Sequence, residues 1–203
     1  MLAFGVVTVA HLILLGFDAD PWDSITKCLL APLLIGWVVR SRGPRLLIVA
    51  LIGCFFGDLF LEFDDAWFPV GMAAFAVAHV CFIVFFVQHG AGDRLRRAPW
   101  IPVVFLLGGI ALIVWCWSGL PGDIRPLVPF YAALLAGTAM TALAVDIRAG
   151  IGAVCFMVSD SIIAASQADR IDPDLAATRL AIMVLYIAAI FLLTTGIVRK
   201  EEQ

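Results

Sequence analysis

Three ionisable side chains lie inside stretches of sequence that are otherwise strongly apolar. Asp160 interrupts the run AVCFMVSDSIIAAS (153–166), Asp58 lies near the end of LIGCFFGDLF (51–60), and His79 lies within FAVAHVCFIVFF (75–86). An acid or a base in hydrocarbon costs at least about 2.5 to 3.5 kcal/mol, so such residues normally face a protein interior or a water-filled cavity. These three residues are therefore the first candidates for a functional site.

Helical spacing allows the three side chains to meet at one level of a helix bundle. Glu62 and Asp169 lie in two polar breaks between apolar runs. Asp58 precedes Glu62 by one helical turn, and Asp160 precedes Asp169 by about two turns. The run that contains His79 starts from the break at Glu62, so His79 comes to a comparable depth. We therefore expect one polar pocket. Its walls would include the helical faces Gly71, Phe75, His79, Phe82 and Gly152, Phe156, Asp160, Ala164.

Two carboxyl groups held together in a desolvated site are suited to acid–base chemistry. Their pKa values separate, so one group can donate a proton while the other accepts one. The same division of roles operates in glycoside hydrolysis, where an acid protonates the leaving ether oxygen and a carboxylate stabilises an oxocarbenium ion or activates water. If the apolar segments lie in a membrane, the corresponding substrate would be an ether or an ester near a lipid headgroup.

Plainer structural interpretations stay open for several polar residues. Tyr131 and Tyr186, the only tyrosines in the chain, can anchor helices at a membrane interface or belong to the site. His79 can be a neutral imidazole that bonds across helices, and Asp58 can reach the interface from a helix end. Lys27 can extend its ammonium group from a helix end to water.

The composition indicates an integral membrane protein. Hydrophobic residues make up 63% of the 203-residue chain, whereas they make up about half of an ordinary soluble domain. Eight spans of about 20 residues would use almost the whole chain, so we predict an all-α bundle of eight transmembrane helices in a single domain, residues 1–203. The expected spans are 2–17, 24–39, 46–61, 69–87, 101–117, 127–145, 150–168 and 179–198.

The breaks between these spans alternate in charge. Nine of the thirteen basic residues fall on one side, and ten of the sixteen acidic residues fall near the other. Basic loops normally stay in the cytoplasm, so we predict that the N-terminus and the C-terminus are both cytoplasmic. Each acidic loop alone is a solvated turn, but the regular alternation favours an even number of spans.

The five cysteines have no spacing typical of a disulfide framework or a zinc site. They form no CxxC or CxxH pattern, and four of them lie inside apolar runs: Cys54, Cys81, Cys116 and Cys155. We interpret them as small buried hydrophobic residues. We expect no nucleic-acid partner. The net charge of −3 carries little information, because the position of charges matters more than their sum in a membrane protein.

A set of short motifs extends over nearly the whole chain. They are Lys27 with Pro32, Gly57-Asp58-x-x-Leu61, Gly71-x3-Phe75-x3-His79, Pro129 and Tyr131 leading to Met140, and Gly152-Ala153-x2-Phe156-x2-Ser159-Asp160-Ser161. In these motifs the chain resembles the YhhN/TMEM86 family of eight-span membrane proteins, and the last motif is the most specific. Two positions depart from the family pattern, because Phe82 replaces a frequent tyrosine and Ala189 replaces a usual glutamine.

The resemblance implies an enzyme, because the characterised members of the family are lysoplasmalogenases. Such an enzyme hydrolyses the vinyl ether of a lysoplasmalogen, such as lysoplasmenylethanolamine or lysoplasmenylcholine, to a fatty aldehyde and a glycerophospho-alcohol. From the residues themselves we infer that Asp58 and Asp160 form the catalytic pair and that no metal ion and no organic cofactor is required. We expect an integral protein of a bacterial inner (plasma) membrane that acts on a lysophospholipid. The expected substrate-binding residues are Lys27, His79, Tyr131, Ser159 and Tyr186.

Two other functions are compatible with the same residues. In a small proton-coupled transporter, Asp58, Asp160 and His79 would form a relay. The spans lack matching Pro/Gly breaks, which speaks against a transporter, although Pro32 inside the second span weakens this objection. In a metal-dependent lipid hydrolase the same three residues would bind a divalent ion, but the chain offers a single well-placed histidine and no HxxxH motif.

Overall fold

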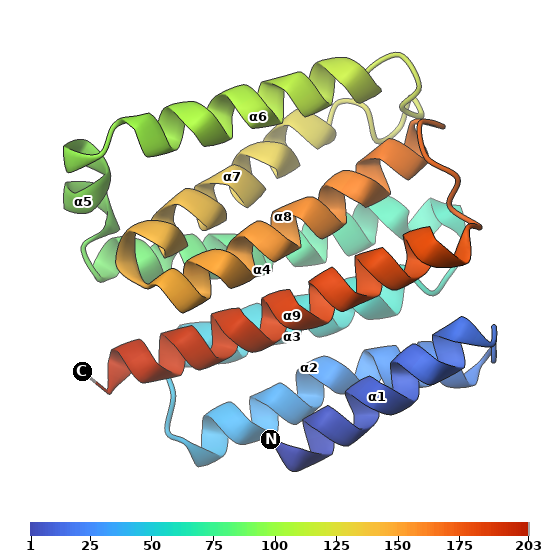
Figure 1. The fold of residues 1–203 in the computed structure, drawn as a ribbon, viewed down its shortest axis with the longest axis horizontal. Coiled ribbons are helices and arrows are strands. Elements are labelled where there is room, and N and C mark those ends of the chain that lie inside the picture. The colour runs from blue at the N-terminus through green and yellow to red at the C-terminus, as the bar shows by residue number, and fades with distance from the viewer. Residues whose placement is uncertain (203) are drawn as a thin grey trace.

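The computed structural model describes residues 1–202 (Figure 1). These residues form nine α-helices and one short 3-10 turn and contain no β-strand, which confirms the all-α prediction. The elements are α1 (Leu2–Gly16), α2 (Trp22–Arg40), α3 (Arg45–Phe60), η1 (Asp65–Trp67), α4 (Phe68–Gln88), α5 (Ala91–Arg97), α6 (Trp100–Cys116), α7 (Val128–Val145), α8 (Ile147–Gln167) and α9 (Ala176–Glu201).

The long helices lie roughly along one common axis, which is horizontal in Figure 1, and long helices that follow one another in sequence are antiparallel. The exception is α5, a seven-residue helix at the left of the view, and the chain bends by 93° between α5 and α6. Loops therefore fall alternately at the two ends of the bundle. The C-terminus lies at the left end, with α5.

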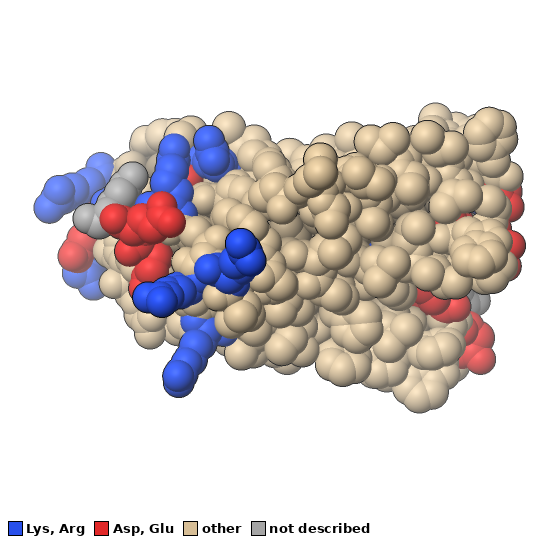
Figure 2. All heavy atoms as spheres, turned by 90° about the horizontal axis from the view of Figure 1, so that it is seen from below, with Lys and Arg blue, Asp and Glu red and all other residues tan. Residues whose placement is uncertain are grey.

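The two ends differ in charge. Figure 2 shows a broad uncharged belt, with the Lys and Arg side chains gathered at the left, where some Asp and Glu side chains lie among them, and with only Asp and Glu side chains visible at the right. We call the left end, with residues 41–44, α5 and the C-terminus, the basic end. The right end, with the loops 17–21, 61–67, 117–127 and 168–175, is called the acidic end. This arrangement follows the charge alternation predicted from the sequence.

The predicted spans agree with the eight long helices to within three residues at each end. Five of the helices, α2, α4, α7, α8 and α9, are long and apolar enough to cross a membrane, and the bent pair α5–α6 makes a sixth if it counts as one span. Helices α1 and α3 contain 15 and 16 residues. A helix of 15 residues is only about 22 Å long, against roughly 30 Å of bilayer core. Helix length and apolarity thus identify five or six spans, and the total of eight stays a prediction.

Several helix starts follow from proline and aspartate. Helix α3 follows Pro44, and α4 and α7 carry Pro69 and Pro129 in their first turn, where a missing N–H leaves no hydrogen bond unmade. Helix α8 starts at Asp146, whose side chain accepts a hydrogen bond of 2.9 Å from the backbone N–H of Ala149.

Asp146 is also an ionic contact at the basic end. Its Oδ2 accepts a 2.5 Å hydrogen bond from the guanidinium of Arg199 on α9, and its side chain is only 8% exposed. Burial by itself raises the pKa of Asp146, but the N–H of Ala149 and the Arg199 guanidinium outweigh burial and hold this pKa below its ordinary value. Asp146 thus ties the start of α8 to the end of α9.

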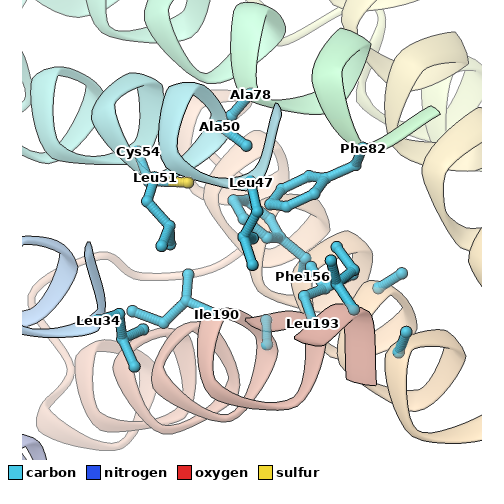
Figure 3. Close-up of a cluster of buried hydrophobic side chains, with 14 of the residues drawn as sticks. Leu34, Leu47, Ala50, Leu51, Cys54, Ala78, Phe82, Phe156, Ile190 and Leu193 are labelled. Atoms are coloured by element: carbon cyan, nitrogen blue, oxygen red, sulfur yellow. The ribbon is translucent and has the colours of Figure 1, made fainter. Parts of the chain in front are cut away.

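The hydrophobic core lies between α2, α3, α4, α8 and α9 (Figure 3). Phe82 on α4 and Phe156 on α8 are among its largest fully buried side chains, and Leu34, Leu47 and Leu193 belong to the same cluster. Because Phe156 lies one turn before the second candidate aspartate on α8, this core supports the polar region from the direction of the basic end.

Two glycines let α3 and α4 approach each other closely. A Cβ atom on Gly53 would lie 2.8 Å from the carbonyl oxygen of Ala74, and one on Gly57 would lie 2.5 Å from the ring of Phe75. Only glycine allows this approach, which brings the residue that follows Gly57, Asp58, close to α4.

Candidate active site

A cavity of about 100 Å³ lies in the half of the bundle nearer the acidic end. Helices α2, α3, α4, α6, α7, α8 and α9 all contribute to its wall. Most of the polar residues in the wall are those predicted from the sequence: Lys27, Asp58, Tyr131, Ser159, Asp160 and Tyr186. The structure therefore brings together six of the seven predicted site residues.

Each aspartate accepts a hydrogen bond from a tyrosine on a neighbouring helix. Tyr186 on α9 donates from its hydroxyl to Oδ2 of Asp58 on α3, across 2.6 Å. Tyr131 on α7 donates from its hydroxyl to Oδ2 of Asp160 on α8, across 2.5 Å. Both distances are at the short end of the range for O–H···O hydrogen bonds, so these contacts fix the orientation of both carboxyl groups.

Aromatic rings hold the two tyrosines in place. Phe156 contacts the ring of Tyr186 edge to face, with the centroids 5.5 Å apart, and Phe75 does so at 6.0 Å. His79 stands edge to face with Tyr131 at 5.7 Å and with Phe156 at 4.7 Å. Rings packed in this geometry restrict each other's rotation, so the hydroxyl groups are aimed before any ligand binds.

His79 lies behind the cavity wall, and it is the one predicted site residue that does not line the cavity. It is fully buried, and its Nδ1 lies 3.0 Å from Oγ1 of Thr138 on α7. Its Nε2 is buried without a hydrogen-bond partner. This position suits a residue that joins α4 to α7 and supports Tyr131, and a direct contact with substrate stays a prediction.

Ser159 has a structural bond in addition to its place in the wall. Its hydroxyl donates to the carbonyl oxygen of Ile182 on α9, across 3.0 Å, and the residue is 1% exposed. The bond joins α8 to α9 one residue before Asp160. Ser159 therefore fixes the backbone that carries one of the two acids.

Lys27 forms an ion pair that was not predicted from the sequence. Its Nζ lies 2.6 Å from Oε1 of Glu62, which follows α3 at the acidic end. Partial burial raises the pKa of Glu62, but the charge of Lys27 and the hydrogen bonds from Lys27 and Ser24 outweigh it, so this pKa is below the ordinary value. Glu62 is therefore ionised at neutral pH.

The rest of the cavity wall is apolar except for Ser161 and Gln167. Its side chains come from the end of α3, the start of α4, the end of α6 and the loop after α6. They are Leu61, Phe68, Met72, Leu112, Ile113, Cys116, Leu120 and Ile124. A surface of this kind, continuous with a polar end, suits a ligand with a hydrocarbon chain and a polar head.

The residues that form this cavity all lie within one family match. The model of the YhhN family matches residues 22–197, from the first residue of α2 into α9. The chain belongs to the YhhN family. The match includes every residue of the cavity wall, from Lys27 to Tyr186.

Curated relatives extend this result. Proteins named lysoplasmalogenase from Mycobacterium bovis and Mycobacterium tuberculosis are each 35% identical over 132 residues, which cover 61% of this chain and 50% of the relative. The chain thus spans about half the length of these two relatives. A human protein named Lysoplasmalogenase TMEM86B is 31% identical over 181 residues, or 87% of this chain and 76% of the relative. No solved structure matches the chain.

Sequence reasoning missed two parts of the site in this YhhN-family chain. In the sequence, Glu62 is one of several acids in a loop that is expected to be solvated. Its spacing of one helical turn from Asp58 was the only indication that it lies near the same site. The apolar wall gave no signal, because apolar residues facing lipid and those facing a cavity have the same composition in a membrane helix.

Metal binding was one of the alternatives drawn from the sequence. Among residues 1–202, no three His, Cys, Asp or Glu side chains form a group that could hold a metal ion. Asp58, His79 and Asp160 therefore do not converge as a ligand set, because His79 lies behind the wall in which both acids lie.

Proposed function

We propose that the protein is a membrane hydrolase that cleaves the vinyl ether bond of lysoplasmalogens. Lysoplasmenylethanolamine and lysoplasmenylcholine would give a fatty aldehyde and glycerophosphoethanolamine or glycerophosphocholine. One observation carries the proposal: Asp58 and Asp160, each held by a tyrosine hydroxyl, line one cavity that has an apolar wall. The names of the mycobacterial and human relatives support it.

The proposed reaction consumes one water molecule. One aspartic acid donates its proton to the vinyl carbon that is not bonded to oxygen, and a C–H bond replaces the π bond. The resulting positive charge is shared by the neighbouring carbon and the ether oxygen as an oxocarbenium ion. The other aspartate takes a proton from water as the water oxygen attacks that carbon. The hemiacetal then releases the glycerol oxygen as an alcohol and leaves the aldehyde.

The other residues of the cavity position the substrate and the two acids. Tyr131 and Tyr186 orient the carboxyl groups, and Ser159 holds α8 beside α9. Lys27 faces the lipid phosphate as a point charge. His79 supports Tyr131 from behind. The hydrocarbon chain lies along the apolar wall, with the vinyl ether at the level of the aspartates.

We also propose that all eight long helices cross the inner membrane of a bacterium as a single transmembrane domain. The charge difference between the basic and acidic ends supports a cytoplasmic position for both termini, because basic loops normally stay in the cytoplasm. The short helices α1 and α3 can be accommodated by local thinning of the bilayer, which costs only fractions of a kcal/mol per ångström of mismatch.

The test is the release of fatty aldehyde from a lysoplasmalogen by detergent-purified protein. We expect release that resists EDTA and falls at least about 100-fold in Asp58→Asn and in Asp160→Asn. Asp64→Asn removes an exposed acid from the loop after α3 and is the matched control, with a rate equal to that of the wild type.

Three results would contradict the proposal. Release that EDTA abolishes would point to a metal site. Wild-type rates in both aspartate variants would exclude the carboxylate pair. No aldehyde from folded wild-type protein with either headgroup would overturn the vinyl-ether assignment, and proton-coupled flux into liposomes would then be measured instead.

A further inference from the structure

A partly buried ion pair lies at the polar end of the cavity. Lys27 Nζ on α2 is 2.6 Å from Glu62 Oε1, and the two side chains are 17% and 25% exposed. Lys27 lines the cavity, and so does Leu61, the residue next to Glu62. A ligand that fills the cavity would therefore bring its polar head beside both charges.

Lys27 is the only basic residue in the cavity wall, within residues 1–202. The other basic residues at the acidic end are engaged elsewhere. Arg125 and Arg170 donate hydrogen bonds to backbone carbonyl groups. Arg179 forms an ion pair with Asp18. An anionic group in the cavity thus meets Lys27, and the charge beside it is the carboxylate of Glu62.

The pair of charges matches a zwitterionic headgroup. A phosphate esterified to ethanolamine or choline holds a negative and a positive charge two carbons apart. When such a group lies alongside the pair, its phosphate meets Lys27 and its amine meets Glu62, so that the four charges alternate in sign. Because the protein charges are partly desolvated, this attraction is stronger than it would be in bulk water.

We propose that the Lys27–Glu62 pair selects single-chain ether phospholipids with a zwitterionic headgroup, and that Glu62 is the residue that recognises the amine. This inference rests on the proposed function for the placement of the hydrocarbon chain along the apolar wall. Glu62 is then a specificity-determining residue that takes no part in the acid–base chemistry of the two aspartates.

The pair also acts against headgroups that lack an amine. A phosphodiester of glycerol has the same phosphate but no positive charge. Its phosphate would draw Lys27 away from Glu62 and leave the carboxylate unpaired beside a second negative charge. Like charges in a partly desolvated site repel, so the discrimination depends on the charge of Glu62.

The test measures binding without hydrolysis. Saturated ether lysolipids have no vinyl group, so the proposed reaction cannot cleave them. Dissociation constants for an ether lysophosphatidylethanolamine and an ether lysophosphatidylglycerol are measured by microscale thermophoresis in a non-ionic detergent, which adds neither phosphate nor amine. The wild type should bind the ethanolamine lipid about tenfold more tightly. Equal affinities would overturn the proposal.

Three variants separate the two roles in the pair. Glu62→Gln should lose the preference because it weakens binding of the ethanolamine lipid alone. Lys27→Gln should weaken both lipids, since both carry a phosphate. Asp64→Asn removes the same charge from the same loop and should keep the preference. The proposal is overturned if Glu62→Gln keeps the preference, if it weakens both lipids by the same factor, or if Asp64→Asn loses the preference.

This result is separable from the outcome of the hydrolase test. Selective binding of the ethanolamine lipid without any aldehyde release would keep the headgroup inference and overturn the proposed reaction. Aldehyde release with equal affinity for the two ligands would do the reverse. If Glu62→Gln does not fold, the affinities of the wild type for the two lipids still test the headgroup preference, because that comparison needs no variant.

Discussion

Tyr186 follows Asp58 by 128 positions in the chain, yet its hydroxyl lies 2.6 Å from Oδ2 of that aspartate. The same relationship recurs between Tyr131 and Asp160, at 2.5 Å. Each carboxyl group of the candidate site thus has its own phenol donor on an adjacent helix. A buried carboxyl group needs such a partner, and a phenol supplies it without adding a second charge.

Removal of either hydroxyl tests whether these bonds serve the reaction. Tyr186→Phe and Tyr131→Phe keep the rings, and therefore the contacts with Phe156 and His79. Leaving a buried carboxyl group without its hydrogen-bond donor costs about 1 to 3 kcal/mol, so we expect kcat for aldehyde release to fall about tenfold in each variant. The measurement is kcat and KM for each, together with the unfolding temperature.

Thr195→Val is the control for the two tyrosine variants. It also removes a hydroxyl, but Thr195 is only partly buried on α9 and bonds only to carbonyl groups of its own helix. Its kcat should equal that of the wild type. Unchanged kcat in both tyrosine variants would show that the phenols serve stability alone.

The helices were predictable because each is a run of apolar residues that ends at charged or Pro/Gly-containing breaks. The run with Asp58, for example, ends at Glu62, and the helix ends at Phe60. The number of helices that are long enough to span a bilayer was less predictable. The end of α1 was predicted to within one residue, but its 15 residues are few for a bilayer, and the sequence does not show whether so short a helix crosses it.

The candidate acids were predictable for a different reason. A charge in an apolar run is unfavourable unless the fold gives it a partner, so Asp58 and Asp160 stand out in sequence. Their partners did not stand out, because hydrogen bonds between helices depend on rotation and register that sequence spacing does not specify. His79 shows the same limit: of the face predicted to line the pocket only Phe75 lies in the cavity wall, and the ring of His79 packs against Phe156 instead.

Gly57→Ala tests the close approach of α3 and α4. The new methyl group would lie 2.5 Å from Cδ2 and Cε2 of Phe75, so the ring must move. Overpacking of this kind costs about 1 to 3 kcal/mol, and a displaced Phe75 also loses its contact with Tyr186. We expect a lower unfolding temperature and slower aldehyde release, measured by thermal unfolding in detergent and by the aldehyde assay.

Gly36→Ala is the matched control, because a Cβ atom at Gly36 on α2 has no neighbour within 4 Å. It should leave activity unchanged and raise stability by up to about 1 kcal/mol, since alanine favours a helix over glycine. If Gly57→Ala and Gly36→Ala have equal unfolding temperatures, the close approach at Gly57 does not limit stability.

Asp146→Ala tests the pH dependence of stability at the basic end. The pKa of Asp146 in the folded protein is below 3.8, its ordinary value, so the carboxylate stabilises the fold above pH 3.8 and loses this effect as pH falls through the folded-state pKa. We expect Asp146→Ala to lower the free energy of unfolding by about 1 to 2 kcal/mol at neutral pH, because the variant lacks the cap of α8 and the hydrogen bond to Arg199. The measurement is the unfolding temperature of the wild type and of Asp146→Ala from neutral pH to below pH 3.8.

The difference between wild type and Asp146→Ala should therefore shrink as pH falls below 3.8, because the wild-type side chain becomes neutral there. Asp93→Ala is the control: Asp93 is 79% exposed, at the start of α5, and its contact with Arg96 is long at 3.8 Å. Exposed pairs of this kind contribute little, so Asp93→Ala should match the wild type at every pH. If the unfolding temperature of Asp146→Ala is below that of the wild type by the same amount at every pH, then the packing of the Asp146 side chain, and not its charge, stabilises the fold.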